Sequence, residues 1–259
     1  MTAEKPPRLY SDLAWLWPTW GDPAGEYASF ARHVAERLRQ RARRPVATLL
    51  DVACGGGKNL FTLKRSFRCV GLDLSPAMLA LARKLNPECE FVQGDMRSFD
   101  LGRTFDAVLI DDGVSHLTTR AELAAAFQTA FRHLAPGGVL AVAADAVAET
   151  FQQNRTEAAS AFPGSCPPEL DVTFIQNQYD PDPADERYET ALIYLIRERG
   201  RLRIETDRFD LGLFPRSFWH DALAAAGFDV AEETYRQDDV DFPLFVGLKP
   251  ESSPSGETP

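Results

Sequence analysis

A glycine run near residue 55 is the part of the sequence that most clearly points to chemistry. Residues 49–59 read Leu-Leu-Asp-Val-Ala-Cys-Gly-Gly-Gly-Lys-Asn, between a short apolar segment and a predicted helix. Glycines at such a junction let the backbone approach a ligand closely. The phosphate-loop pattern GxxxxGK[ST] does not fit, because Val52 stands at its first position and Asn59 follows Lys58. The dinucleotide pattern GxGxxG fits weakly, since Leu60 replaces its third glycine.

Two acids flank this run in a third arrangement. Asp51 lies at the end of the predicted first strand, and Asp73 closes the second strand at Val-Gly-Leu-Asp. This order resembles the class I S-adenosylmethionine (SAM)-dependent methyltransferases. A carboxylate at the end of strand two can accept both ribose hydroxyls, as in dinucleotide-binding folds. The resemblance implies that Asp73 binds the ribose and that Asp51 helps to hold the ammonium group of SAM, directly or through water.

Further motifs follow in the order of that family. The segment Gly-Asp-Met-Arg at 94–97 resembles the one that reads adenine, with Asp95 accepting the exocyclic amine. Residues 105–110 resemble the fourth strand, and Leu-Ala-Pro-Gly-Gly-Val at 134–139 resembles the loop before the fifth. Singly, a glycine cluster is more often a turn, but here four motifs stand in register. The resemblance implies SAM as cofactor and S-adenosylhomocysteine (SAH) as product, with further contacts at Tyr10, Trp17, Ala53, Gly55, Leu74, Met78, Met96 and Asp111.

The acceptor side is predicted in Asp-Asp-Gly-Val-Ser-His-Leu, 111–117, which follows the fourth strand. The carboxyl edge of a parallel sheet is where ligands bind in this architecture. His116 is the candidate base for an amine proton, because histidine ordinarily titrates near neutral pH; the alternative is a polar residue before a helix. Asp112 is the candidate acid that orients a cationic amine. Asp111 can share that role or satisfy loop amides.

The aromatic residues near the start of the chain allow two interpretations. Tyr10, Trp15, Trp17 and Trp20 can pack on the sheet edge, or form a lid whose rings face a sulfonium or ammonium charge. In methyltransferases of the type that this sequence resembles, an N-terminal segment beginning with a similar tyrosine closes over SAM. That resemblance favours the lid for Tyr10 and Trp17.

Within the class, the sequence is most similar to small-molecule N-methyltransferases: those acting on nucleotide-linked amino sugars and, more distantly, glycine and sarcosine N-methyltransferases. The resemblance implies N-methylation of a small-molecule amine and an antiparallel sheet that covers the acceptor pocket and supports a homodimer. Asp111 and Asp112 depart from the pattern, which has uncharged residues there, and 147–164 lacks the aromatic residues of the sugar enzymes. A small-molecule O-methyltransferase and a non-catalytic SAM-fold binding protein remain alternatives; a nicotinamide oxidoreductase is a more distant one.

A framework of alternating strands and helices must position these residues. Strands are predicted at 46–53, 69–73, 90–93, 105–110 and 139–143, with helices between them; the helix opening at Thr119 carries Leu134 and ends at the Pro-Gly-Gly segment 136–138. This rhythm indicates a parallel sheet with helices on both faces. Polar-alternating segments at 171–179, 187–197 and 201–211, the last two linked at Gly200, indicate an inserted antiparallel sheet. A helix at 215–226 and strands at 228–235 and 242–248 complete the chain.

The predicted fold is therefore α/β: a Rossmann-like, doubly wound, seven-stranded, mostly parallel sheet with an inserted antiparallel β lid. We expect an N-terminal lid and helix at 1–45 and a SAM-binding core at 46–145. An inserted lid and dimer region follows at 146–212, then the last helix and strands at 213–249 and a disordered tail at 250–259.

Composition limits the classes of partner. The 259 residues can bury a sizeable core, and 44% hydrophobic with 25% charged residues is typical of a globular chain. A net charge of −10 repels phosphate backbones, so no nucleic acid is expected. The four cysteines are scattered, which predicts no metal site. No stretch has the length of a signal peptide core or a membrane span, so we expect a cytoplasmic protein with no membrane partner.

Overall fold

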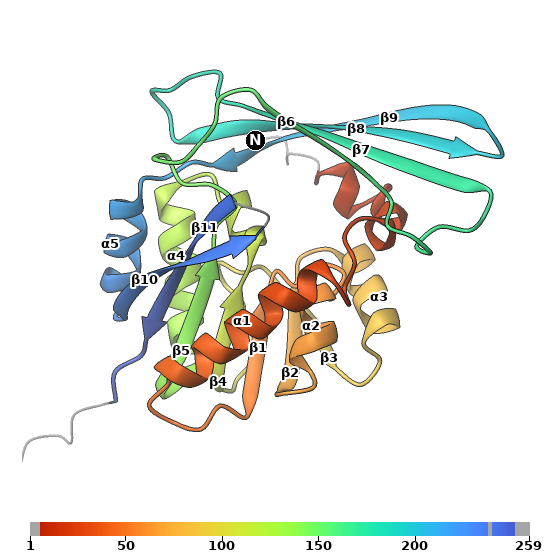
Figure 1. The fold of residues 1–259 in the computed structure, drawn as a ribbon. Coiled ribbons are helices and arrows are strands. Elements are labelled where there is room, and N and C mark those ends of the chain that lie inside the picture. The colour runs from red at the N-terminus through yellow and green to blue at the C-terminus, as the bar shows by residue number, and fades with distance from the viewer. Residues whose placement is uncertain (1–5, 238–239, 252–259) are drawn as a thin grey trace, which may run out of the picture.

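The computed structural model describes residues 6–237 and 240–251, which form two sheets and their covering helices (Figure 1). The larger sheet has seven strands in the order β10-β11-β5-β4-β1-β2-β3. Strands β1 to β5 run parallel, whereas β11 is antiparallel to β5 and β10 to β11. The bounds are β1 Thr48–Val52, β2 Arg68–Asp73, β3 Glu90–Gln93, β4 Phe105–Ile110, β5 Leu134–Ala143, β10 Asp229–Gln237 and β11 Val240–Leu248. The predicted seven-stranded, mostly parallel sheet is confirmed.

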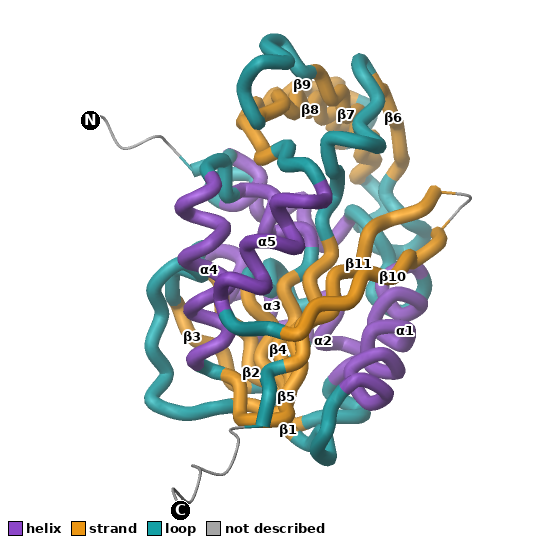
Figure 2. The backbone as a smooth tube through the Cα atoms, turned by 90° about the vertical axis from the view of Figure 1, so that its left-hand side faces the viewer, coloured by secondary structure: helices purple, strands orange, loops and turns teal. Residues whose placement is uncertain are grey.

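Helices cover both faces of this sheet (Figure 2). Leu49 and Leu50 are neighbours on β1 and therefore point to opposite faces. Leu49 packs in a buried cluster with residues of α1 and α2, and Leu50 packs in another with residues of α4 and α5. Both faces of β1 are thus buried. The helices span α1 Glu26–Arg41, α2 Lys58–Leu63, α3 Pro76–Leu85, α4 Arg120–Arg132 and α5 Arg216–Ala226.

The end of α4 differs from the sequence-based expectation. The helix stops at Arg132. Leu134, which was predicted to be helical, is already the first residue of β5 and pairs with Phe105 of β4. The residue before a proline avoids the helical conformation, so the chain must leave the helix before Pro136. A register shift in the β4–β5 pairing then accommodates the Pro-Gly-Gly segment. Only the pairing from Val139 onward is regular.

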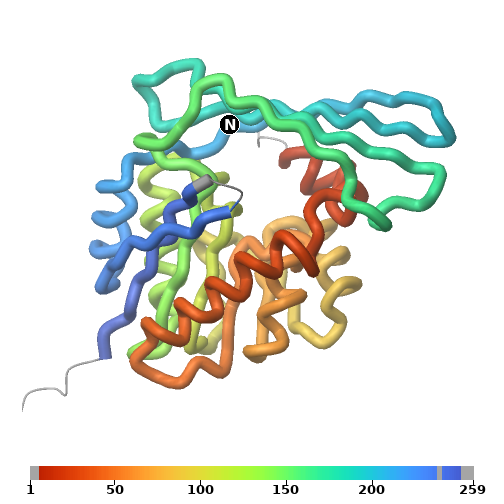
Figure 3. The backbone as a smooth tube through the Cα atoms, viewed as in Figure 1, coloured from red at the N-terminus to blue at the C-terminus, as the bar shows by residue number. Residues whose placement is uncertain are grey.

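The second sheet is antiparallel and lies between β5 and α5 in the sequence. Its order is β6 (Arg155–Ser160), β7 (Leu170–Tyr179), β8 (Arg187–Glu198) and β9 (Arg201–Gly212). It lies across the ends of the parallel strands and is called the lid below (Figures 1 and 3). The inserted antiparallel sheet is confirmed, although β6 was not predicted. The link between β8 and β9 is as tight as expected, with positive φ at Arg199 and Gly200, as a type I′ turn requires.

The first elements that the structure describes lie beneath the lid. Two short 3₁₀ helices, η1 (Arg8–Tyr10) and η2 (Ala14–Thr19), precede α1. Leu9 and Leu16 are buried in one cluster with Phe174 and Tyr194 of the lid. This segment therefore packs between the lid and the parallel sheet (Figure 3). The predicted tail at 250–259 falls outside the described residues from position 252 onward.

Candidate functional site

The glycine run forms a tight loop between β1 and α2. Ala53, Gly55 and Gly57 have φ of 58°, 52° and 78°. The indole of Trp17 lies directly on this loop: a Cβ added at Gly56 would stand 2.3 Å from Trp17 Cδ1. A side chain at position 56 would therefore displace the ring. The loop and Trp17 are therefore in contact, and the lid interpretation of the aromatic segment stays a prediction.

Asp73 lies at the end of β2, beside this loop. One carboxylate oxygen accepts the Gly55 N–H at 2.8 Å, and the other accepts the Ser75 N–H at 2.8 Å. Burial raises the pKa of Asp73, and the backbone hydrogen bonds act in the opposite direction. A carboxylate has about four acceptor positions, so each oxygen can still accept a hydroxyl. The neighbouring Leu74 is exposed, and Met78 is fully buried with its amide donating to the Ser75 hydroxyl.

Asp51 is buried at the end of β1, with 1% of its surface exposed. Neither of its oxygens has a hydrogen-bond donor among the described residues. Burial raises its pKa well above the ordinary value, with smaller contributions from Asp111 and Asp73. A buried carboxylate without a partner is costly, and a bound cation removes that cost. Asp51 therefore has the surroundings expected of a site for an ammonium group.

Asp95 differs from Asp51 and Asp73 in having a cationic partner. Its carboxylate forms a bidentate pair with the guanidinium of Arg97, with a shortest distance of 2.6 Å. These hydrogen bonds from Arg97 lower the pKa of Asp95. Arg97 in turn bonds Glu122 on α4 at 2.5 Å. Met96 is partly buried and packs against the core. The predicted contact of Asp95 with adenine remains a prediction, to be made with the lone pairs that Arg97 leaves free.

Tyr10 and His116 form a hydrogen-bonded pair. The hydroxyl of Tyr10 lies 3.1 Å from Nε2 of His116, and their rings meet edge to face. The carbonyl of Tyr10 also accepts the Ser75 hydroxyl at 2.6 Å, which holds the N-terminal segment at the end of β2. Phe209 of the lid contacts both rings. Burial lowers the pKa of His116 to about 4, so this histidine is neutral at pH 7.

Three carboxylates gather at the ends of β4 and β5. Asp111 accepts the Asn59 amide at 2.7 Å, and the 3₁₀ turn η3 (Asp112–His116) follows it. Asp145 accepts the Tyr188 hydroxyl and the Gln178 amide of the lid, each at 2.8 Å. Burial raises the pKa of Asp112 well above its ordinary value, and the charges of Asp145 and Asp111 raise it further. All three face a cavity of about 160 Å³, also lined by Glu26, Tyr27, Phe30, Ala143, Ala144, Tyr235, Gln237 and Phe242.

The structure thus places the predicted residues in two neighbouring groups. Asp51, Ala53, Gly55, Asp73 and Trp17 surround the glycine loop, whereas Asp111 and Asp112 line the cavity. Tyr10 and His116 form their hydrogen-bonded pair outside the cavity lining. Sequence reasoning missed Asp145, Tyr27 and Tyr188. The position of Asp145 just after β5 is a signal that could have indicated it. Nothing in the sequence shows that Tyr188 reaches Asp145, since 43 residues separate them.

Comparison with known proteins identifies the family. Residues 49–138 match a family model described as a methyltransferase domain. Over 207 residues, 79% of this chain and 78% of the relative, the sequence is 35% identical to dTDP-3-amino-3,6-dideoxy-alpha-D-glucopyranose N,N-dimethyltransferase of Streptomyces fradiae. The protein belongs to the class I SAM-dependent methyltransferases.

Solved structures agree with this assignment over nearly the whole methyltransferase. SAM-bound CalS10, an amino pentose methyltransferase from Micromonospora echinaspora, is 33% identical with a TM-score of 0.76, covering 88% of this chain and 93% of that one. The sugar N-methyltransferase KedS8 from Streptoalloteichus sp ATCC 53650 is 29% identical with a TM-score of 0.80, covering 97% and 96%. The methyl donor of the methyltransferase is SAM, and the unpartnered carboxylate of Asp51 fits its ammonium group.

Two other properties of the methyltransferase concern the described residues as a whole. No group of three or more His, Cys, Asp or Glu side chains within 6–237 and 240–251 is arranged to hold a metal ion. In the same part of the chain, no helix is both long enough and apolar enough to span a membrane.

Proposed function

We propose that this methyltransferase N-methylates the amine of a nucleotide-linked amino sugar in the cavity beside Asp111, Asp112 and Asp145. The names of its relatives support this acceptor. Besides the Streptomyces fradiae enzyme, dTDP-3-amino-3,4,6-trideoxy-alpha-D-glucopyranose N,N-dimethyltransferase of Streptomyces venezuelae is 43% identical over 128 residues, 49% of this chain and 54% of the relative. In both names the methylated group is an amine on a dTDP-linked sugar.

The charge of the cavity is the observation in this structure that supports the proposal most directly. Its lining carries three aspartates and Glu26 but no lysine, arginine or histidine among the described residues. A protonated amine entering this space is attracted by the carboxylates and offsets the cost of keeping them ionised away from water. A neutral hydroxyl acceptor would leave that cost in place. The cavity therefore favours an amine over an alcohol.

The mechanism requires that the amine lose its proton before it attacks the methyl group. Asp112 is the first candidate to accept that proton. Its pKa is raised, and a general base works best when its pKa lies near the operating pH, which an ordinary aspartate does not reach. His116 is the second candidate; its pKa of about 4 makes it a weak base, and its hydrogen bond holds the Tyr10 hydroxyl. When bound, SAM would supply a methyl group on a sulfonium, with the neutral thioether SAH as a good leaving group. The protein then has to align the amine and exclude water.

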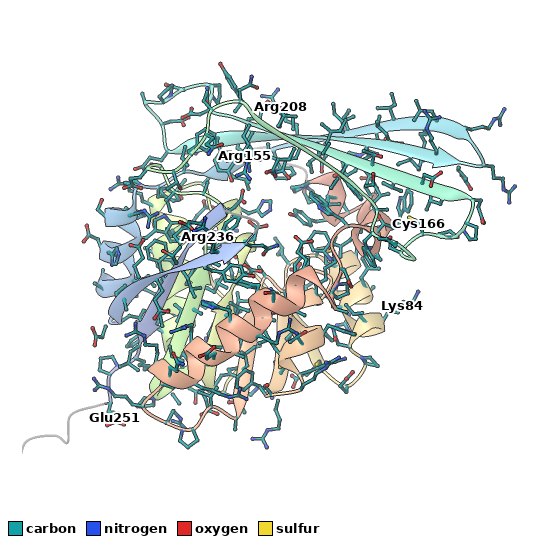
Figure 4. All side chains as sticks on the ribbon, in the orientation of Figure 1. Lys84, Arg155, Cys166, Arg208, Arg236 and Glu251 are labelled. Atoms are coloured by element: carbon teal, nitrogen blue, oxygen red, sulfur yellow. The ribbon has the colours of Figure 1, made fainter. Side chains whose placement is uncertain are left out.

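Side chains of the lid and of the parallel sheet project into the space between these layers (Figure 4). Asp145 joins the layers through its hydrogen bonds to Gln178 and Tyr188. We propose that the lid closes the acceptor cavity from above and excludes water from it. The division of the chain at residues 45, 145, 212 and 249 stays part of this proposal. It is supported by the position of the lid strands, β6 to β9, between β5 and α5 in the sequence.

The experiment is a mass-spectrometric assay of the purified protein with SAM. dTDP-linked 3-amino and 4-amino sugars are the test acceptors, and the corresponding dTDP-linked hydroxyl sugars are the matched controls. The expected result is a gain of one or two methyl groups on the amines alone. Methylation of the hydroxyl sugars, with the amines unchanged, would show that this is an O-methyltransferase and that the acidic cavity has been misinterpreted.

A homodimer formed through the outer face of the lid is also part of the proposal. Ile193, Leu202 and Ile204 are exposed there, and Ile193 stands opposite Ile175 in the β7–β8 pairing. Contiguous exposed apolar side chains of this kind mark interaction surfaces. Light scattering after gel filtration should give twice the monomer mass, and Ile204→Lys should give the monomer. A monomeric wild-type protein at all concentrations would refute this interface.

We also propose a reducing, cytoplasmic location. All four cysteines, Cys54, Cys69, Cys89 and Cys166, lie among the described residues and are free. Free thiols are typical of proteins kept in a reducing compartment. Recovery of the native protein in the membrane or secreted fraction of its own cells would refute this location.

A further inference from the structure

Lys58, the first residue of α2, is a buried cation. Only 4% of its surface is exposed, and its Nζ lies 4.6 Å from the centroid of the Trp17 ring and 4.9 Å from that of Tyr27. No carboxylate among the described residues lies within ion-pair distance of it; Glu26 and Asp22 act on it only from farther away. Burial consequently lowers its pKa to about 7. A lysine is rarely buried unless it is paired.

Lys58 directly follows the glycine loop and shares Trp17 with it. The Trp17 ring contacts the ammonium group of Lys58 and also stands against Gly55 and Gly56. The indole Nε1 of Trp17 is itself buried and has no acceptor within the described part of the chain. Two hydrogen-bond donors that need an anionic or acceptor partner are thus gathered at one loop.

Two acceptors without donors stand at the other end of the same loop. These are the oxygens of Asp51, at the end of β1. An unpaired cation with an unpaired N–H, together with an unpaired carboxylate, is complementary to a zwitterion. The methionyl group of SAM is such a zwitterion, with one α-carboxylate and one α-ammonium group.

We propose that Lys58, assisted by the indole N–H of Trp17, binds the α-carboxylate of the methionyl group of SAM, while Asp51 receives its ammonium group. The phosphate-loop motif is absent, so the lysine after the glycines is not part of a phosphate-binding loop. A bound carboxylate supplies the anion that Lys58 otherwise lacks. The proposal rests on SAM as the donor and is independent of the acceptor, so it stands or falls separately from the amino-sugar assignment.

The competing explanation is that Lys58 only fastens the N-terminal segment to α2 by its contacts with Trp17 and Tyr27. An ammonium group over aromatic rings is stabilised by them. However, an apolar side chain such as methionine would fill the space between the rings without burying a charge. The two explanations therefore differ in what a charge-removing substitution does to ligands with and without a carboxylate.

The test measures the binding of two ligands that differ only in that group. SAH and its decarboxylated form, S-adenosyl-3-thiopropylamine, are titrated calorimetrically into the full-length protein. The wild type should bind SAH roughly 10- to 100-fold more tightly, the range expected for hydrogen bonds to a charged group. Lys58→Met, which keeps an unbranched chain between the rings, should weaken SAH alone and bring the two affinities within about threefold.

Two more variants make the result decisive. Lys64 directly follows the last residue of α2 and pairs with Glu88 at 2.8 Å. Lys64→Met is the matched control and should leave the preference for SAH unchanged. Trp17→Phe keeps the ring and Lys58 but removes the N–H, and should reduce the preference by a smaller factor. Equal weakening of both ligands in Lys58→Met would make Lys58 a structural clamp. A wild-type protein without preference for SAH, or an unchanged preference in both site variants, would overturn the proposal.

Discussion

Replacing Asp51 by asparagine should stabilise the free protein while weakening its binding of the donor. Asp51 is buried, and its two oxygens have no donor among the described residues. In the absence of ligand it therefore lowers the free energy of unfolding. Asparagine has nearly the same shape but cannot ionise. In the bound state the situation reverses, because the carboxylate is the proposed partner of the ammonium group of SAM.

The magnitude follows from the raised pKa of Asp51. In the unfolded chain the pKa is near 3.8, and in the folded protein burial raises it well above that value. The unfolded state therefore releases its proton first, and the free energy of unfolding falls as pH rises from 3.8 toward the folded pKa. At about 1.4 kcal/mol per pH unit the loss at pH 7 is at most about 4 kcal/mol. A buried asparagine amide costs about 1–3 kcal/mol, so Asp51→Asn should gain about 1–3 kcal/mol.

The assay combines urea unfolding at pH 4.5 and pH 7 with calorimetric titration of SAH. The advantage of Asp51→Asn in free energy of unfolding should be larger at pH 7, and its affinity for SAH should fall roughly 10- to 100-fold. The matched control is Asp106→Asn, because the buried Asp106 accepts hydrogen bonds from Ala47 and Thr48, which help to lower its pKa. Asp106→Asn should destabilise the protein. An Asp51→Asn variant less stable than wild type at pH 7, or one that binds SAH normally, would refute the reasoning.

Three further predictions concern the remaining site residues. Asp73→Ala should weaken SAM by about 2 kcal/mol through one or two lost hydrogen bonds, whereas the exposed Asp100→Ala should not; equal calorimetric affinities would remove Asp73 from the ribose site. Asp112→Asn should raise KM for the amine or lower kcat roughly tenfold or more, with SAH affinity retained, and normal steady-state kinetics would contradict its role. His116 should stay neutral down to about pH 4, so its NMR titration should have no midpoint near 6.5; stability that His116 contributes above pH 6.5 should be lost as pH falls toward 4.

The framework was readable from the sequence because its signals are local. Thr119 caps α4 where the sequence predicted that this helix opens, and the apolar runs of β1 and β4 are buried. By contrast, β6 carries the sequence Arg-Thr-Glu-Ala-Ala-Ser and is mostly exposed, so it has no hydrophobic alternation. It is a strand only because β7 pairs with it. Local pattern cannot show a strand that depends on its neighbour.

The site divides in the same way. Asp51, Gly55 and Asp73 could be predicted as site residues because strand ends and glycines mark the ligand edge of a parallel sheet. The interpretation of Lys58 needed the structure, since only there do Trp17 and Tyr27 enclose it. These rings come from the N-terminal segment and from α1, and their proximity to α2 depends on tertiary packing. The partners of a buried charge are a property of the whole fold.

The burial of the N-terminal segment beneath the lid has a consequence for synthesis of the chain. The amide of Leu9 donates to Asp207, 198 residues later, and Arg8 bonds Glu205. A ribosome makes the N-terminal segment before these partners. Glu205 and Asp207 of β9 follow after about four-fifths of the chain, and the apolar residues of β7 and β8 that pack with Leu9 and Leu16 follow after about two-thirds. Until then Leu9, Leu13 and Leu16 have no lid against which to pack, although the SAM-binding strands are already complete. The N-terminal segment is thus made long before the strands that cover it, and a nascent chain that stalls before β7 leaves it exposed.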